Sequence, residues 1–164
     1  MPSHLPAPSL EHVADLRVEV ATPIEAGATF GLNSRGRRRI IPITGGTLSG
    51  PHFSGRVLPG GADFQLVVSE TSADLDARYI VALDSPGLEG QHLYIQNHAL
   101  RRGSVEDMAR LVRGERVDPG VIYFRSTLTL EVSCEPLRWL TESVLVGTGA
   151  RHPDHVRIAI YRVV

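Results

Sequence analysis

The sequence predicts a mainly β protein: a single closed antiparallel β-barrel with one short helix near a barrel mouth. Many segments alternate between apolar and polar residues, which is the period of a strand with one buried face. Clusters of glycine and proline separate these segments at short intervals. Only one segment has helical spacing, and about eight or more strands with one helix are typical of a closed barrel.

The composition indicates an ordinary globular protein. A chain of 164 residues suits one domain with a real core. We expect residues 1–14, which hold three prolines, to be a flexible lead-in and residues 15–164 to form the barrel domain. The single cysteine, Cys134, excludes an intramolecular disulfide and is expected to be a small buried residue.

The first half of the chain reads as short strands. Residues 15–21 alternate as a half-buried strand does, and the glycine-rich residues 22–33 form a connection that could hold another short strand. Three short strands joined by tight turns are expected within residues 37–65, because glycine pairs interrupt the apolar runs. The Pro59-Gly60 pair fits the centre of a type II turn.

Three further strands are expected over residues 62–68, 73–83 and 91–97. The one convincing helix spans residues 104–114. Ser104 is a good N-cap, the apolar residues that follow recur at helical spacing, and Gly114 suits the position just past the end.

The last part of the chain supplies the closing strands. Residues 121–134 alternate over their whole length, and residues 139–147 and 156–163 are expected to close the barrel. Residues 151–154 form the hairpin turn between the last two strands.

The polar candidates within residues 37–65 are Arg39, Arg56 and Asp63. Asp63 follows a glycine turn at the start of a strand, where a carboxylate could act as a general base or could accept backbone hydrogen bonds of the turn. The basic run around Arg39 could bind phosphates, but no aromatic residues interleave with it for base stacking. A solvated turn with one inward arginine is the favoured interpretation.

Other candidates lie on strand faces whose direction the sequence leaves open. Asp76 and Arg78 are neighbours on one face, where they would orient a ligand if inside and contribute little if outside. Asn97 continues an apolar face and could bind a carbonyl or satisfy backbone groups at a barrel end. Tyr123 and Arg125 share the polar face of their strand, which faces either solvent or a cavity.

Several ordered motifs resemble one known family. They are R-R-I-I-P-I-T-G-G-T, G-R-V-L-P-G-G-A-D, L-D-A-R-Y, Y-I-Q-N, Y-F-R-S, W-L and V-G-T-G. Together they span nearly the whole chain, which resembles the DUF3237 family of small bacterial and fungal proteins. The resemblance implies a single β-barrel domain and brings no assigned catalytic residues.

Recognisable cofactor motifs are missing from the sequence: there is no Walker loop, dinucleotide fingerprint or G-x-S-x-G elbow, and the seven histidines are scattered. We therefore expect no cofactor and no metal. The lead hypothesis is a cofactor-independent lyase or isomerase that carries out elimination, retro-aldol cleavage, enolisation or cyclisation of a small oxygenated aromatic or polyketide-like metabolite. Asp63 would be the base and Tyr123 the acid, and the substrate-binding residues would be Arg39, Arg56, Asp76, Arg78, Asn97, Arg125 and Trp139.

Two other functions use the same barrel. A non-catalytic carrier, as lipocalins are, needs a cavity without strongly perturbed ionisable groups, and a structural protein would fill its barrel with its own side chains. The expected partner is a small molecule. A net charge of −1 implies no general nucleic-acid affinity. No membrane span or signal peptide is recognised, so a cytoplasmic protein is expected, and a homodimer is the default.

Overall fold

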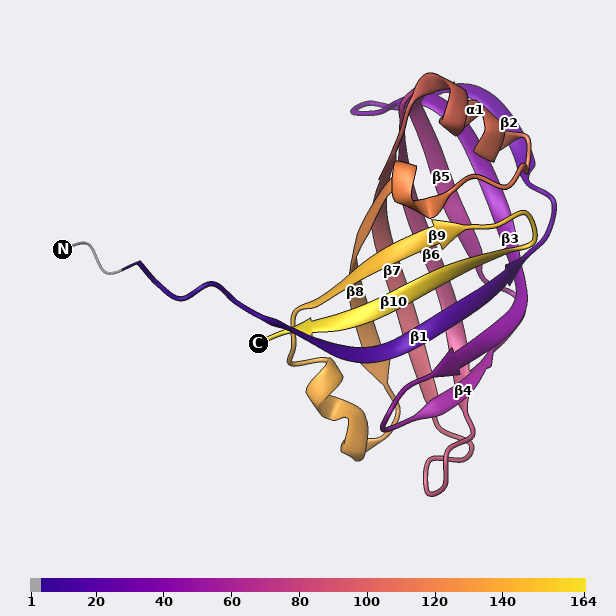
Figure 1. The fold of residues 1–164 in the computed structure, drawn as a ribbon. Coiled ribbons are helices and arrows are strands. Elements are labelled where there is room, and N and C mark those ends of the chain that lie inside the picture. The colour runs from indigo at the N-terminus through magenta and orange to yellow at the C-terminus, as the bar shows by residue number, and fades with distance from the viewer. Residues whose placement is uncertain (1–3) are drawn as a thin grey trace.

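The structure, a computed structural model, describes residues 4–164 and confirms the predicted barrel. One antiparallel sheet curls around until its ends meet (Figure 1). The strands are β1 (Leu10–Val20), β2 (Ile24–Phe30), β3 (Arg35–Ser49), β4 (Ser54–Val57), β5 (Ala62–Ser69), β6 (Ser72–Leu83), β7 (His92–Arg102), β8 (Tyr123–Val132), β9 (Leu145–Arg151) and β10 (His155–Val163). The helices are α1 (Val105–Val112) and two 3₁₀ helices, η1 (Pro119–Val121) and η2 (Glu135–Leu140).

Eight strands close the ring and two are additional. The order around the barrel runs β1-β10-β9-β8-β7-β6, after which β4 and β5 both lie between β6 and β3. β3 then pairs with β1 and closes the barrel, because Leu16 of β1 lies opposite Leu48 of β3. β2 extends the sheet beyond this ring by pairing with the first part of β3.

β3 corrects the prediction of separate short strands before and after the first glycine pair. It runs without a break from Arg35 through Gly46 to Ser49, so the glycines bend the strand and do not end it. Gly46 has φ +133°, and a Cβ there would collide with the backbone oxygen of Arg17 on β1. Only glycine permits this close crossing. The bend lets one strand pair with β5 at one end and with β1 at the other.

Two further boundaries differ from those expected. β1 begins at Leu10, inside the segment expected to be a flexible lead-in, because residues 10–12 pair with the end of β10. Residues 1–3 lie outside the described part. The stretch around Trp139 is the 3₁₀ helix η2, not the beginning of a strand, since Pro136 stands in its first turn where the missing N–H costs nothing.

The helix is as predicted. The side chain of Ser104 accepts a hydrogen bond from the backbone N–H of Asp107, and Gly114 follows the C-cap with φ +78°. α1 lies across one end of the barrel (Figure 1) and buries Met108 and Leu111. Within residues 4–164, no helix has the length and apolar character needed to cross a membrane.

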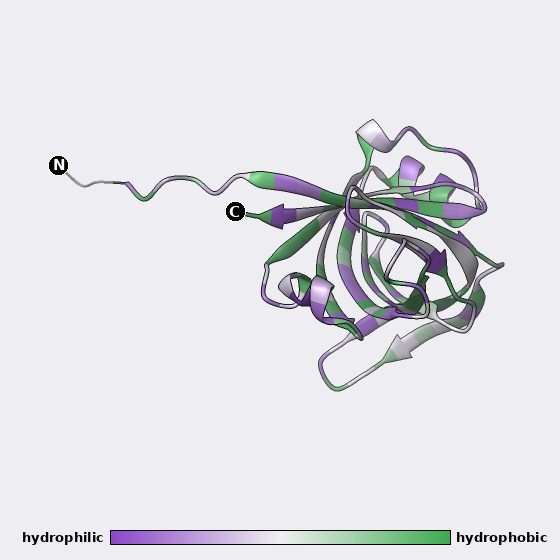
Figure 2. Cartoon of the chain, turned by 90° about the horizontal axis from the view of Figure 1, so that it is seen from below, coloured by the Kyte–Doolittle hydropathy of each residue, from purple (hydrophilic) through white to green (hydrophobic). Residues whose placement is uncertain are grey.

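The barrel interior is filled unevenly. A large apolar cluster occupies the end away from α1, and Leu137 and Leu140 of η2 belong to it. A smaller cluster lies under α1 and includes Met108 and Phe124. Seen from below, the strands wrap around a common axis, with hydrophilic and hydrophobic residues alternating along them (Figure 2). The polar interior described next lies between the two clusters.

Candidate functional site

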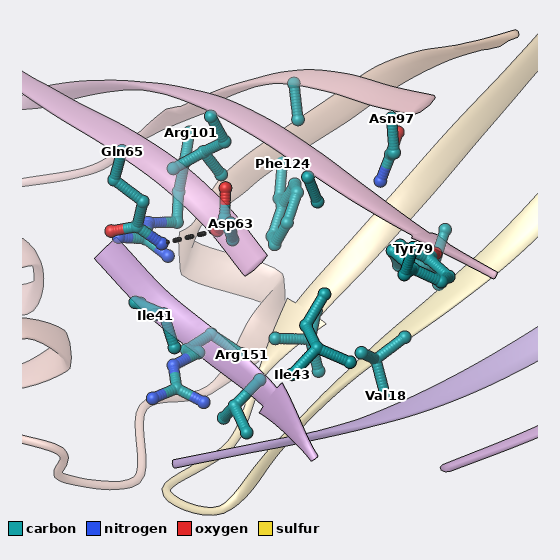
Figure 3. Close-up of a pocket in the computed structure, with 16 residues that line it drawn as sticks. Val18, Ile41, Ile43, Asp63, Gln65, Tyr79, Asn97, Arg101, Phe124 and Arg151 are labelled. Atoms are coloured by element: carbon teal, nitrogen blue, oxygen red, sulfur yellow. Dashed lines mark hydrogen bonds between the residues drawn. The ribbon is translucent and has the colours of Figure 1, made fainter. Parts of the chain in front are cut away.

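The candidate site is a small cavity of about 30 Å³ inside the barrel. Most of its wall is apolar, and six polar side chains interrupt that wall. They come from β5, β6, β7 and β9: Asp63, Gln65, Tyr79, Asn97, Arg101 and Arg151 (Figure 3). The empty volume suits one or two water molecules. A larger ligand would have to extend from this cavity towards its mouth.

Strand register explains why these side chains meet. Asp63 of β5 lies opposite Ala77 of β6, and Ala77 lies opposite Asn97 of β7, so all three belong to one row across the sheet. Because side chains alternate along a strand, residues two positions away on each strand also face inward. This adds Gln65 beside Asp63 and Arg101 beyond Asn97. The small side chain of Ala77 leaves open space between Asp63 and Asn97.

Five buried polar atoms in this cavity have no hydrogen-bond partner among the described residues. Within residues 4–164, only one other buried side-chain atom, Ser126 Oγ, is in that condition. An unpaired buried polar group costs about 1–3 kcal/mol, so such atoms seldom gather without a reason. The five are Asp63 Oδ1, Gln65 Oε1, Tyr79 Oη, Asn97 Oδ1 and Arg101 Nε.

Asp63 is the central ionisable group of the cavity. Burial raises the pKa of its carboxyl group, and a hydrogen bond from Gln65, the charges of Arg101 and Arg151 and the backbone of Asp76 offset part of that rise. Gln65 Nε2 donates to Asp63 Oδ2 at 2.7 Å, as the dashed line in Figure 3 shows, while Oδ1 stays free. A carboxylate that is held on one oxygen and desolvated on the other is a stronger base than one in water.

Two arginines stand near Asp63 without touching it. Burial lowers the pKa of Arg101 to about 10, and it also lowers the pKa of Arg151, yet both groups remain cationic near neutral pH. Among the described residues, neither arginine has a nitrogen within 4.0 Å of an Asp63 oxygen. The charges attract across a gap, and atoms of a ligand could occupy that gap. Burial also raises the pKa of Tyr79, which keeps its hydroxyl group neutral.

A wider vestibule of about 530 Å³ adjoins the cavity. Five residues line both spaces and form their common boundary: Val20, Ile41, Gln65, Arg101 and Arg151. Arg39 lies in the vestibule wall, only 4% exposed, and its Nε donates to Glu25 Oε1 at 2.7 Å. Four arginines and two carboxylates line the vestibule, which favours anionic or carbonyl-bearing ligands. The charged side chains are Arg39, Arg101, Arg113, Arg151, Glu25 and Asp154.

Of the residues expected from the sequence, three lie at this site. Asp63 and Asn97 line the cavity, and Arg39 lies in the vestibule. The remaining candidates do not line the cavity, which corrects the expected placement of Arg56, Asp76, Arg78, Tyr123, Arg125 and Trp139.

The alternation of side chains along a strand explains most of these corrections. Phe124 of β8 faces the cavity, so Tyr123 and Arg125 point outward, where the Arg125 guanidinium lies 5.3 Å from the Tyr123 ring centre. Asp76 and Arg78 form an outward ion pair at 3.0 Å, because Ala77 between them faces inward.

The other two corrections have separate causes. Arg56 lies exposed on the short strand β4. Trp139 belongs to η2 and packs against the apolar core cluster, with the Arg162 guanidinium 5.5 Å from its ring centre. Neither residue reaches the cavity.

Four cavity residues were not predicted from the sequence: Gln65, Tyr79, Arg101 and Arg151. A period-two extension from the recognised residues would have found two of them, since Gln65 stands two after Asp63 and Arg101 stands four after Asn97. Tyr79 could not be recognised as a site residue from the sequence, because a tyrosine on an apolar strand face is usually a core residue. Arg151 was assigned to a turn, but it is the last residue of β9 and points inward.

No group of three His, Cys, Asp or Glu side chains is arranged to hold a metal ion in the described residues. The polar set of the cavity consists instead of one carboxyl group, two amides, two guanidinium groups and a phenol. Such a set can bind oxygen atoms and exchange a proton with a ligand.

Comparison with known proteins places this chain in a family. The model of the family described as "Protein of unknown function (DUF3237)" matches residues 8–163. A UPF0311 protein of Bradyrhizobium diazoefficiens is 39% identical over 158 residues, which cover 96% of this chain and 98% of that protein. Another UPF0311 protein, from Rhodopseudomonas palustris, is 43% identical over 128 residues, or 78% of this chain and 81% of that protein.

Solved structures agree with the fold. A conserved protein of unknown function from Rhodopseudomonas palustris superposes with a TM-score of 0.88 at 37% identity, covering 98% of this chain and 100% of that one. A β-barrel-like protein from Acinetobacter baumannii gives 0.81 at 37% identity, covering 98% and 99%. An enzyme from Penicillium herquei shares the fold at a TM-score of 0.63 and 15% identity, with both chains fully covered. The chain belongs to the DUF3237 family.

Proposed function

We propose that this protein is a cofactor-independent acid–base enzyme, a lyase or an isomerase, that acts on a small oxygen-rich molecule. One observation carries the proposal: five unpaired buried polar atoms converge on a single cavity that also holds a desolvated carboxyl group. A protein that used the barrel only as a scaffold would gain stability by replacing these groups with apolar ones. A bound ligand would satisfy them.

The proposed base is Asp63. Its Oδ1 has no hydrogen-bond partner among the described residues, and burial makes the carboxylate a better proton acceptor because it raises the pKa. Gln65 positions the carboxyl group through Oδ2 and leaves the reacting oxygen free. The charges of Arg101 and Arg151 oppose the effect of burial, because they lower the pKa of Asp63.

The proposed reaction begins with removal of a proton from a carbon next to a carbonyl group. Asp63 takes the proton, the electron pair of the broken C–H bond forms a C=C bond, and the carbonyl π pair moves to oxygen. Arg101 and Arg151 stabilise the resulting enolate oxygen by their charge. The enolate then either regains a proton at another atom, which is isomerisation, or expels a group from the neighbouring carbon, which is elimination.

The remaining polar groups bind the rest of the molecule. Gln65 Oε1 and Asn97 Oδ1 both lack donors, so they favour a ligand that carries hydroxyl groups. The neutral Tyr79 hydroxyl group can donate to a ligand oxygen at the deeper end of the cavity (Figure 3). An oxygenated aromatic or polyketide-like compound carries both kinds of group. The Penicillium herquei protein is described as an enzyme, so a barrel of this type is compatible with catalysis.

Solvent exchange tests the proposal without knowledge of the natural substrate. The protein is incubated in D₂O with hydroxylated acetophenones, 1,3-diketones and small oxo acids, and ¹H NMR measures the loss of protons next to each carbonyl group. We expect accelerated exchange for part of this panel. Asp63→Asn should slow that exchange by about a hundredfold or more.

The matched control is Asp76→Asn, which removes a carboxylate from the outer face of the neighbouring strand. Exchange that survives in Asp63→Asn, or that falls equally in both variants, would refute the assignment of the base. Tight binding of panel compounds with no exchange by the wild-type protein would instead identify a non-catalytic carrier.

A further inference from the structure

A second hollow, here called the α1 groove, adjoins the cavity and the vestibule at Arg101. It has a volume of about 640 Å³ and runs between α1, the hairpin of β2 and β3, and the turn that joins β5 to β6. α1 and β2 lie side by side at this end of the barrel (Figure 1). Its wall is mainly apolar and includes Ala28, Phe30, Val67, Val68, Val105, Met108, Ala109 and Val112.

One face of α1 lines this groove. Val105, Met108, Ala109 and Val112 stand at helical spacing and form a continuous stripe along it. The opposite wall offers Phe30, which is 81% exposed. Val105 and Val68 are also half exposed, at 50% and 53%. Apolar side chains gathered around one hollow are stabilised when an apolar ligand removes them from water.

Arg101 lies at the boundary between the α1 groove and the candidate active site. Its side chain lines the cavity, the vestibule and the groove, and it is the one residue common to all three. Arg101 is only 3% exposed, and its Nε has no partner among the described residues. A buried unpaired donor at this junction indicates a ligand group that accepts from it. A ligand held there by its polar end can extend its other end into the groove.

We propose that the α1 groove binds the apolar part of the substrate, which is therefore amphipathic: a carboxylate or carbonyl head at Arg101 and an apolar chain or ring of several carbons. The inference rests on the proposed function for the identity of the head. Binding in the groove is separate from the chemistry, because none of its apolar wall residues lines the cavity of Asp63, and Arg101 is the one wall residue that lines both. The small cavity then needs to admit only the reacting end.

A homologous series of carboxylates tests this directly. Calorimetry measures the affinity of the wild-type protein for butanoate, hexanoate, octanoate and decanoate. Each added methylene group should tighten binding by up to about fourfold until the chain fills the groove. Ala109→Trp should fill the groove, because Ala109 is an exposed residue on its wall, and should remove the dependence on chain length, so that decanoate binds no more tightly than butanoate.

The matched control is Glu106→Trp, which adds the same side chain to an exposed position of α1 outside the groove. It should keep the wild-type dependence on chain length. Phe30→Ala is a second variant that cannot disturb the core, since Phe30 is 81% exposed, and it should weaken the longest chains most. Affinity that does not change with chain length, or equal losses in Ala109→Trp and Glu106→Trp, would overturn the proposal.

Two further outcomes separate this inference from the proposed function. Asp63→Asn should abolish proton exchange but keep the dependence of affinity on chain length. If the wild-type protein shows a chain-length effect but no proton exchange, the groove proposal is supported and the enzyme proposal is refuted. Light scattering completes the test. If the protein is a dimer that Ala109→Trp or Phe30→Ala converts to a monomer, a second copy covers the groove and the inference is wrong.

Discussion

Replacement of Tyr79 by phenylalanine should stabilise the ligand-free protein. Tyr79 is 3% exposed, and its hydroxyl group lies in the cavity without a partner in the described residues. Burial of an unpaired hydroxyl group costs about 1–3 kcal/mol, and phenylalanine keeps the packing of the ring. Unfolding of a domain releases about 2.1 cal/mol/K of entropy for each residue, which for this chain corresponds to about 3 °C for each kcal/mol. The melting temperature should therefore rise by about 3–9 °C.

Differential scanning calorimetry on ligand-free protein measures this shift. The control is Tyr123→Phe, which removes a hydroxyl group from a residue that is 50% exposed and should change stability by less than about 0.5 kcal/mol. A melting temperature that stays the same or falls in Tyr79→Phe would show that the hydroxyl group already has a partner. Tyr79 would then no longer count among the unpaired groups that are proposed to bind a ligand.

Three other predictions concern Asp63, its neighbours and the core. Because burial raises the pKa of Asp63, the folded protein keeps a proton that the unfolded chain loses above about pH 4, so the stability of the wild type falls as the pH rises from there. In urea unfolding, the stability of Asp63→Asn relative to the wild type should therefore increase from about pH 4 upward, and parallel stability curves would contradict this. Gln65→Leu removes the hydrogen bond that lowers the pKa of Asp63 and should move the pH profile of proton exchange to higher pH; an unchanged profile would mean that Gln65 does not tune the base. Leu93→Ala should lower the free energy of unfolding by about 2–5 kcal/mol, because the side chain is fully buried. It should leave the Kd of butanoate unchanged, and a change in that Kd would link the core to the site.

The barrel was predictable because its strands alternate clearly. β6 and β8 each have one apolar face, and that period alone identifies half-buried strands. The errors arose where local chemistry has two structural outcomes. Gly46 was taken as a strand break, but here it supports a bend at a crossing with β1. Residues near Trp139 are apolar enough for a strand, and only the proline in the first turn favours a 3₁₀ helix.

The site was predicted in part, for a reason that concerns desolvation. Tyr123 and Arg125 were chosen because they share a polar strand face, and such a face in this barrel is the one that meets solvent. The cavity residues are instead single polar exceptions on apolar faces, as Asn97 is between Ile95 and Ala99. A lone polar residue among inward apolar neighbours must be buried, so it marks the interior more reliably than a polar row. This rule does not identify Arg151, because Arg151 is the last residue of its strand.

The closure between β1 and β10 has a consequence for synthesis of the protein. Leu10 pairs with Val163 and Glu19 pairs with His155, so these two strands join regions that the ribosome makes at very different times. Val18 of β1 and Ile158 of β10 both belong to the cavity wall, which stays incomplete until β10 has emerged. A nascent chain that stops before residue 155 exposes two strand edges, on β1 and β9, and such edges recruit other chains. The cavity is not yet formed at that stage, so ligand binding cannot cover these edges while the chain is being made.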